Sequence, residues 1–521
     1  MGGRSSPVVA AVREVAASHE VLAAVDLGSN SFRLQVGRVV EDQIYPLDSL
    51  REAVRLGAGL DSDKRLDEAA QQRALAALER FGERLRGFPP GSVRAVGTNT
   101  LRVAKNAPEF LRRAERALGF PIEVVAGKEE ARLIYLGVSH SLPPTSERRL
   151  VVDIGGGSTE FIIGSGHRPQ KLESLYMGCV SFTLRYFGDG RITRAALRQA
   201  ETAARVEVQT IEKEFSAGHW QQAVGSSGTA RALADVMALN GWTDGSITAE
   251  GMDRLRTHLL RVADVDRIGT LGLKADRAQV LPGGFAIMAG IFAELGVASM
   301  QLAAGAMRQG ILYDMLGRFH HRDMRDTTVR QFVRRHHVDA RQARQVDALA
   351  QQIMDALEGD LAPDEAARQR LSWAAHLHEI GLTVAHAGYH RHSAYILANA
   401  DMPGFSRMEQ AELALLVHAH RGSLEKIAPL VTRADQWPLI LALRLSCLFH
   451  RSRFPLEVPP LEASQTRERR FEIRLPTAWL RRYPLTAAAL DGEVRDWKAA
   501  GFELRIPALA EGADELDLDA G

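Results

Sequence analysis

The sequence predicts an α/β protein with an internal duplication, followed by an all-α region and a small α+β region. Two stretches align without a gap, VDLGSNS beginning at Val25 and VDIGGGS beginning at Val152. Each follows a β-rich run, and each leads into an alternating apolar run that ends at Gly37 or Gly164. In both copies the pattern predicts a strand, a tight turn with free backbone N–H groups, and a second strand.

A second pair of segments repeats downstream in the same order. AVGTNTLR begins at Ala95, and AVGSSGTAR begins at Ala223. Both predict a strand, a small polar loop and the start of a helix, whose N-terminus favours an anion. Chance does not readily repeat both motifs in order, so we infer two copies of one α/β domain. Their four loops predict one polyanionic ligand at the carboxyl ends of the strands.

The expected elements follow in chain order. The strands and helices predicted for the two copies are strands 21–27 and 32–36, a helix over 67–86, a Pro-Gly break at 88–91, a helix over 108–118, a helix from 127, a polar turn at 142–145, and strands 150–154 and 161–163. Alternation of strands and helices is typical of α/β domains.

The rest of the chain changes character. From His320 to about Leu461 the pattern is almost wholly helical, with breaks at 359–363 and 402–404. Beyond it, short alternating runs at 471–475 and 502–506 flank a helix over 487–498, before a frayed acidic tail. The predicted domains are 21–135, 136–317, 318–461 and 462–514.

Composition excludes several classes of protein. With 65 Lys and Arg against 64 Asp and Glu, the net charge of +1 argues against non-specific nucleic-acid binding. Cys179 and Cys447 are far apart, which argues against a disulfide framework or a zinc site. Arg13 and Glu14 interrupt the apolar start of the chain, which argues against a signal peptide. The apolar segment 280–300 contains Pro282 and predicts a buried helix and not a membrane span. We expect a cytoplasmic protein, and peripheral attachment to the inner membrane stays open.

Paired carboxylates open the helix between the two copies. Glu129 and Glu130 lie in its first turn, where the helix dipole alone would stabilise them. Adjacent helical residues diverge by about 100°, so only one of them can face a cleft. A carboxylate there could also orient and deprotonate water. The residues alone leave both interpretations open.

The two hairpins differ at one pair of positions. Asp153 at a strand end is a common position for a hard-cation ligand, and Glu160 begins the next strand, where it could equally be a solvated edge residue. In the first copy the corresponding residues are Asp26 and Arg33. One half could therefore present carboxylates to a cation and the other an arginine to terminal phosphate oxygens.

Together these motifs resemble a known family. DLGSNSFRL, GTNTLRVAKN, GKEEARLIYLGV, VDIGGGSTEFIIG, MGCVSF and GSSGTAR resemble the exopolyphosphatase and guanosine pentaphosphate phosphohydrolase (Ppx/GppA) family, and most closely its exopolyphosphatases. That family has the duplicated actin, heat-shock chaperone and sugar-kinase (ribonuclease H-like) fold. The stretch AAHLHEIGLTVAHAGYHRHSAYILANADMPGFS is similar to the all-α HD-like domain of the long bacterial members.

The resemblance implies a metal-dependent phosphoanhydride hydrolase, using Mg²⁺ or Mn²⁺, that releases the terminal phosphate of inorganic polyphosphate. It implies Glu130 as the catalytic base, Asp153, Glu160 and Asp26 as metal ligands, and a homodimer. The phosphate-binding residues that it implies are Gly28, Ser29, Asn30, Ser31, Arg33, Thr98, Asn99, Arg102, Gly155, Gly156, Gly157, Ser158, Gly225, Ser226, Ser227, Gly228 and Thr229.

Histidines gather in the helical region. An HD hydrolase would use an adjacent His-Asp pair, and this chain has His378-Glu379 instead. His336 or His337 could serve as an upstream ligand, but packing and capping explain most of these histidines. We expect a degenerate, metal-free domain that contacts polymer through Arg391, His392 and Arg421.

Three alternatives stay open at this stage. Hydrolysis of guanosine pentaphosphate to the tetraphosphate uses the same chemistry, an ATP-dependent small-molecule kinase shares the duplicated fold, and a non-catalytic actin-type protein would lack the carboxylates. One departure from the family lies near the GAMRQG segment, which begins at Gly305. Residues 302–305 include no acidic residue, although one is expected there in long members.

Overall fold

The structure, a computed structural model, describes residues 21–40, 43–143, 145–273, 275–319, 323–358, 364–453, 458–459, 461–467 and 469–509. The chain forms two compact units, one ending at Met324 and the other beginning at Arg325. The expected N-terminal start, the break at 359–363, part of the turn at 142–145 and the acidic tail lie outside the described residues.

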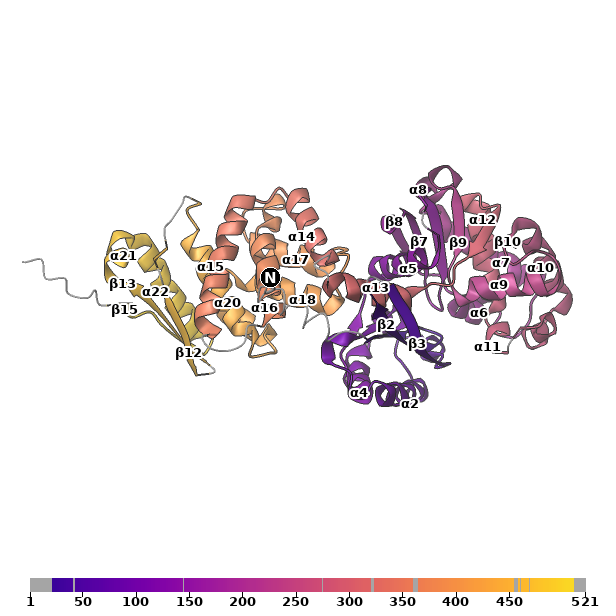
Figure 1. Cartoon of the computed structure of the whole chain (residues 1–521), viewed down its shortest axis with the longest axis horizontal. Coiled ribbons are helices and arrows are strands. Elements are labelled where there is room, and N and C mark those ends of the chain that lie inside the picture. Colours follow the sequence, from indigo (N-terminus) through magenta and orange to yellow (C-terminus); the bar gives the residue numbers. More distant parts are fainter. Residues whose placement is uncertain are drawn as a thin grey trace, which may run out of the picture. The chain divides into compact units, whose positions relative to one another are not determined.

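The first unit opens with a five-stranded sheet in the order β3-β2-β1-β4-β5. Its elements are β1 Val21–Leu27, β2 Phe32–Val40, β3 Gln43–Glu52, β4 Val93–Gly97, β5 Ile122–Val124, the 3₁₀ turns η1 Leu56–Gly59 and η2 Pro90–Ser92, and the helices α2 Glu68–Arg84, α3 Asn99–Val103 and α4 Ala107–Leu118. Asp67 caps α2 by accepting from the backbone N–H of Ala70. Helices α2 and α4 pack on each other and share one core with this sheet (Figure 1).

A six-stranded sheet follows, in the order β10-β11-β9-β6-β7-β8. Its strands are β6 Arg149–Ile154, β7 Thr159–Ser165, β8 Arg168–Leu175, β9 Gln222–Gly225, β10 Ile247–Thr248 and β11 Ser299–Leu302. Strands β8-β7-β6-β9-β11 repeat the directions and order of the first sheet, and the register slips at Gly37 in one copy and at Gly164 in the other. The predicted duplication is therefore confirmed down to an irregularity. The third strand of each copy, β3 and β8, was not anticipated.

Helices cover this second sheet. They are α6 Cys179–Tyr186, α7 Arg194–Gln209, α8 Glu212–Phe215, α9 Gly228–Leu239, α10 Ala249–Val262, α11 Ala275–Ala278 and α12 Leu281–Leu295, with the 3₁₀ turns η3 Ala217–His219 and η4 Val265–Leu271. The apolar helix α12 is almost entirely buried in their common core, as predicted. In the described part of the chain, no helix combines the length and apolarity needed to cross a membrane.

Two helices join the copies, α5 Gly127–Ser141 and α13 Met307–Phe319. Their apolar side chains form a core with strands of both sheets, and Figure 1 shows the two helices adjacent, between the strands of the two sheets. They approach so closely that a Cβ at Gly137 would lie 2.0 Å from the carbonyl oxygen of Ala306. A Cβ at Gly310 would lie 1.7 Å from that of Leu133, so both positions require glycine.

A buried charge network fixes these two helices to the first sheet. Asp314 of α13 accepts from Arg94 of β4 at 2.6 Å and from Arg132 of α5 at 2.5 Å. Arg132 also pairs with Glu129 at 2.7 Å, and Arg94 pairs with Glu123 of β5 at 3.0 Å. Burial of Asp314 is outweighed by its arginine neighbours, which hold its pKa well below the usual range. The first turn of α5 is therefore linked through Arg132 and Asp314 to α13 and to the first sheet.

The second unit is helical with a small sheet at its end. Its helices are α14 Met324–Arg335, α15 Ala340–Glu358, α16 Glu365–Leu377, η5 Ile380–Thr383, α17 Tyr389–Asn399, α18 Arg407–Ala419, α19 Leu424–Ile427, η6 Ala428–Leu430, α20 Gln436–Phe449, α21 Thr477–Arg482 and α22 Pro484–Ala499. Its strands are β12 Glu462–Arg467, β13 Arg470–Pro476, β14 Glu503–Arg505 and β15 Ala508–Leu509. One core runs through both parts. The four domain boundaries predicted from the sequence stay predictions.

Candidate active site

Strand register brings the four predicted loops to one place. In the first copy β1 is parallel to β4, with Leu27 opposite Gly97, so the 28–31 turn and the 98–99 loop leave the same edge of the sheet. In the second copy β6 is parallel to β9, with Val152 opposite Gly225. The carboxyl ends of parallel strands are where α/β sheets bind their ligands.

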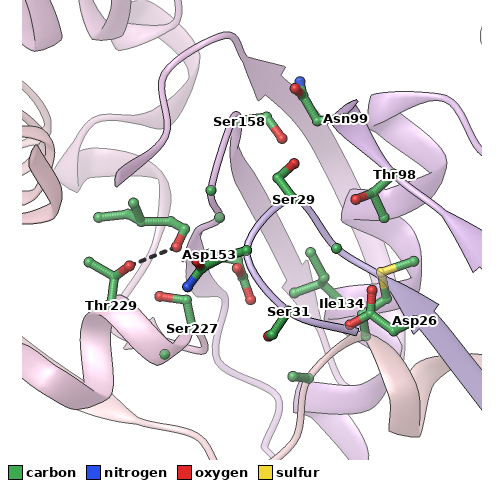
Figure 2. A pocket seen from close by; sticks show the side chains of 18 of the residues that line it. Asp26, Ser29, Ser31, Thr98, Asn99, Ile134, Asp153, Ser158, Ser227 and Thr229 are labelled. Atoms are coloured by element: carbon green, nitrogen blue, oxygen red, sulfur yellow. Dashed lines mark hydrogen bonds between the residues drawn. The ribbon is translucent and has the colours of Figure 1, made fainter. Parts of the chain in front are cut away.

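The turns of the two copies face each other at van der Waals distance. A Cβ built on Gly156 would lie 2.9 Å from the Cβ of Ser29, and one on Gly157 would lie 2.5 Å from Oδ1 of Asn99. Glycine is therefore required at both positions for the halves to close together. Figure 2 shows Ser29, Asn99 and Ser158 around the same space, with Asp153, Ser227 and Thr229 from the second copy beside them.

These loops enclose a cavity of about 150 Å³, here called the central cavity. It is lined by Asp26, Gly28, Ser29, Asn30, Ser31, Arg33, Thr98, Asn99, Glu130, Ile134, Asp153, Ile154, Gly155, Gly156, Gly157, Ser158, Cys179, Ser226, Ser227, Gly228, Thr229, Arg277, Ala306, Met307 and Arg308. Most of the site residues predicted in the first unit line it, and Arg102, Glu160 and Gly225 do not.

Hydrogen-bond donors around the central cavity are held in fixed positions. Thr229 donates to the carbonyl oxygen of Ile154 at 3.0 Å (Figure 2), and Ser227 caps α9 by accepting from Ala230 N. Among the described residues, Nδ2 of Asn99 is buried without a hydrogen-bond partner. A buried unsatisfied donor is costly, and an anion in the cavity would satisfy it.

The structure separates the two adjacent glutamates. Glu129 is buried in the network with Arg132, whereas Glu130 lines the central cavity. Nη1 of Arg102 donates to Oε2 of Glu130 at 2.7 Å and to the carbonyl oxygen of Val125 at 3.0 Å. Only Glu130 is therefore in a position to act on a ligand.

Three further carboxylates crowd this region, and burial disfavours their charged forms. Burial raises the pKa of Asp26 to about 6, against the opposing charges of Arg308 and Arg33. Burial also raises the pKa of Asp153 to about 6, although Ser226 donates to Oδ2 of Asp153 at 2.8 Å. Burial, and then the charges of Glu130 and Asp153, raise the pKa of Glu160 well above its usual range. Glu160 accepts from Ser174 at 2.9 Å.

A divalent cation would relieve this repulsion. Clustered Asp and Glu oxygens are the donors that Mg²⁺ and Mn²⁺ prefer, so the residues fit such an ion. In the described residues, however, no group of three or more His, Cys, Asp and Glu side chains converges well enough to hold a metal alone. Mg²⁺ commonly takes only one or two carboxylates and completes its shell with substrate phosphate and water.

Arginines complete the cavity from the first copy and from α13. Burial, and next the charge of Arg308, lower the pKa of Arg33, and burial lowers that of Arg308. The burial of both arginines and the repulsion of Arg33 by Arg308 favour a bound anion. Arg277 lies against the start of α9, since a Cβ on Gly228 would be 2.5 Å from its Nη2. Sequence reasoning missed Arg277 and Arg308, although Arg308 belongs to the noted GAMRQG segment.

A larger cavity adjoins the central cavity. This arginine cavity, of about 590 Å³, shares Arg33, Arg277 and Arg308 with it and adds Arg51 and Arg231. Asp235 is the single carboxylate among the described residues that line it. Ala238, Leu239 and Leu273 form an apolar part of its wall. The arginine cavity therefore carries a strong positive charge next to the site of four carboxylates.

The predicted polymer residues of the second unit do not share a cavity. Arg391 lines an apolar groove between α17 and α18, Arg421 lines a different cavity beside Tyr389 and His420, and His392 lines neither. His378 is buried with its Nδ1 2.7 Å from the carbonyl oxygen of Ala375. The polymer groove, and the HD-like character of this region, stay predictions.

Comparison with known proteins agrees with this geometry. The model of the Ppx/GppA phosphatase family matches residues 35–319, and that of domain III of Ppx/GppA phosphatases matches residues 324–494. The chain belongs to the Ppx/GppA phosphatase family. Its members hydrolyse phosphoanhydrides and are generally dependent on divalent metals.

Two solved structures of similar proteins cover the first part of the chain. An exopolyphosphatase from Cytophaga hutchinsonii is 24% identical over 57% of this chain and 97% of its own, with a TM-score of 0.52. An exopolyphosphatase-like protein is 25% identical over 56% of this chain and 97% of its own, with a TM-score of 0.51. The first of these supports the fold of the duplicated unit.

Proposed function

We propose that the protein is an exopolyphosphatase, which hydrolyses the terminal phosphoanhydride bond of inorganic polyphosphate and releases orthophosphate. The observation that carries this proposal is that the two cavities adjoin and share three arginines. A central cavity of about 150 Å³ suits one terminal phosphoryl group, and the arginine cavity beyond it offers five arginines to the rest of a linear polyanion. The similarity to a solved exopolyphosphatase-like protein favours the same substrate.

The chain's own residues can perform the reaction. Backbone N–H groups of the 28–31 and 155–158 turns, with Arg33 and Arg308, hold the terminal phosphoryl group and oppose its charge. Glu130 accepts a proton from a water molecule that attacks phosphorus in line with the leaving chain. One P–O bond forms to the water oxygen, and the anhydride P–O bond breaks to give orthophosphate and a chain shorter by one unit.

Asp153 and Asp26 line the central cavity and would hold Mg²⁺ or Mn²⁺ together with substrate phosphate and water, and Glu160, the third predicted ligand, lies behind them. When bound, the ion would neutralise charge on the phosphoryl oxygens. We also propose that the protein is a homodimer and that Arg391, His392 and Arg421 contact the polymer. The mass of the protein in solution tests the dimer. One chain has a mass of 57.1 kDa, and a dimer would have about twice that mass.

A second candidate substrate is guanosine pentaphosphate. The apolar wall of Ala238, Leu239 and Leu273, with the carboxylate of Asp235, could take a purine ring at the far side of the arginine cavity. The deciding experiment measures phosphate release from long-chain polyphosphate and from guanosine pentaphosphate with one preparation of enzyme. Higher kcat/KM on polyphosphate supports the proposal, and hydrolysis of the nucleotide alone contradicts it.

The assigned base has its own test. Glu130→Gln should lower kcat by roughly two to four powers of ten, because a general base typically contributes that much, while polyphosphate still binds. Glu109→Gln, which removes an exposed carboxylate from the first turn of α4, is the matched control and should retain the parental rate. Parental turnover by Glu130→Gln would show that another group activates the water.

A further inference from the structure

Arg102 is separated from the central cavity by the carboxylate that it binds. It is the fourth residue of α3, which follows the loop of Thr98, yet its side chain does not line the cavity. Its Nη1 donates to Oε2 of Glu130 at 2.7 Å and to the carbonyl oxygen of Val125 at 3.0 Å. The side chains of Arg102 and Glu130 are 8% and 9% exposed. A phosphoryl group in the cavity would therefore meet Glu130 before it meets Arg102.

The contact constrains the direction of the carboxylate. Arg102 belongs to α3 and links it to Val125, two residues before α5, and to the first turn of α5. It holds one oxygen of Glu130, and Oε1 accepts no hydrogen bond from a described residue. Because guanidinium donors lie in a fixed plane, two hydrogen bonds from one nitrogen define where Oε2 must lie. The free oxygen is then left for a ligand of the cavity.

The contact also places a positive charge beside Glu130. The negative charge of Glu130 raises the pKa values of Asp26, Asp153 and Glu160, so Glu130 repels each of these three carboxylates. Of the four carboxylates, Glu130 is the one that forms a hydrogen bond with Arg102. The arginine compensates the charge of Glu130 within a buried environment.

We propose that Arg102 is a positioning residue, which orients the carboxylate of Glu130, and that it does not itself bind the substrate phosphate. This inference rests on the proposed function, because it assigns a role in the same hydrolysis. It replaces the phosphate contact that sequence reasoning predicted for Arg102.

Kinetic constants of single variants test the inference first. Arg102→Gln should lower kcat about ten- to a hundredfold, the usual cost of a misplaced catalytic group, and leave KM within about twofold. Arg102→Lys should have a higher kcat than Arg102→Gln, because lysine keeps the positive charge but lacks the planar set of guanidinium donors. A KM that rises at least tenfold while kcat holds would overturn the inference. Arg113→Gln removes an arginine that pairs with Glu68 at 3.0 Å, away from the cavity, and is the matched control.

Binding in an inactive background separates the two roles more sharply. In Glu130→Gln, the amide oxygen can still accept from Arg102, so the arginine keeps its place. Polyphosphate of defined length should then bind Glu130→Gln and Arg102→Gln/Glu130→Gln with dissociation constants within about twofold. A phosphate ligand would instead cost roughly tenfold or more when removed, as hydrogen bonds to charged groups do. Such a loss would overturn the inference.

The outcome is separable from that of the proposed function. If the parental enzyme releases phosphate only from guanosine pentaphosphate, the proposed substrate is wrong, and the same variants are compared with that nucleotide as ligand. Thermal unfolding of each variant shows whether it is folded at the assay temperature. Should Arg102→Gln be unfolded there, Arg102→Lys decides, with an unchanged KM and a lowered kcat in support and a raised KM against.

Discussion

The two hairpins at the centre of the first unit have the same backbone and opposite electrostatics. Across the first hairpin Asp26 is the direct partner of Arg33, and across the second Asp153 is the direct partner of Glu160. One cross-strand pair therefore joins unlike charges and the other joins like charges, which is normally destabilising. The duplicated scaffold supplies two equivalent positions, and under the proposed function Arg33 at one of them contacts the anion while Glu160 at the other serves the cation.

Removing a carboxylate from the second hairpin should have the largest effect. Asp153→Asn should lower kcat by roughly two to three powers of ten, because a catalytic cation supplies several kcal/mol to the transition state. Glu160→Gln, one layer behind the cavity, should cost about ten- to a hundredfold in apparent metal affinity. The check is phosphate release as a function of Mg²⁺ and Mn²⁺ concentration. Unchanged metal dependence in both variants would show that the second hairpin is not the cation site.

Making the first hairpin resemble the second should weaken binding rather than chemistry. Arg33→Glu creates a second pair of like charges across the strands, and we expect KM for polyphosphate to rise about ten- to a hundredfold as a charged phosphate contact is lost. Arg33→Gln should raise KM by a smaller factor than Arg33→Glu. Steady-state kinetics at saturating cation measure both, and a fall in kcat with constant KM would assign Arg33 to the chemical step instead.

The buried aspartates should make the metal-free protein less stable as pH rises. Their pKa values are about 6 in the folded protein, so the folded state binds more protons than the unfolded state between about pH 4 and 6. Stability from each is therefore present below pH 4 and lost as pH rises through 6, by up to about 3 kcal/mol at pH 7.

Asp26→Asn should thus raise the midpoint of thermal unfolding by a few degrees at pH 7 in a chelator, and by less near pH 4. Calorimetry of the two proteins at both pH values is the measurement. A lower midpoint at pH 7 than that of the parental protein would mean that attraction to the charges of Arg308 and Arg33 outweighs the burial of Asp26.

The sequence predicts much of this site because its signal is local. The repeated turns, the start of α5 and the exchange of Glu160 for Arg33 can all be read from short motifs whose spacing fixes the strands around them. Arg308 and Arg277 could not be placed in this way, because 275 residues separate Arg33 from Arg308 and only the packing of α13 against α5 brings them together. The phosphate contact of Arg102 stays a prediction, and its hydrogen bond to Glu130 could not be expected from the motif, since a motif does not show which side chains meet.

Strands β3 and β8 were missed for a different reason. Many of their side chains are exposed or only half-buried, so the apolar alternation that marks β1 and β2 is weak there. In the second unit the predicted helices and the alternating runs are present, but the expected grouping of Arg391, His392 and Arg421 depended on tertiary contacts that no local pattern encodes.

Polyphosphate binding to Glu130→Gln, measured with and without a divalent cation, tests the difference between the hairpins most directly. The account predicts that adding Arg33→Gln weakens binding by a similar factor in both conditions, whereas adding Glu160→Gln weakens only the binding that depends on the cation. Equal losses from the two changes, with the same response to the cation, would contradict the division of roles between the two halves.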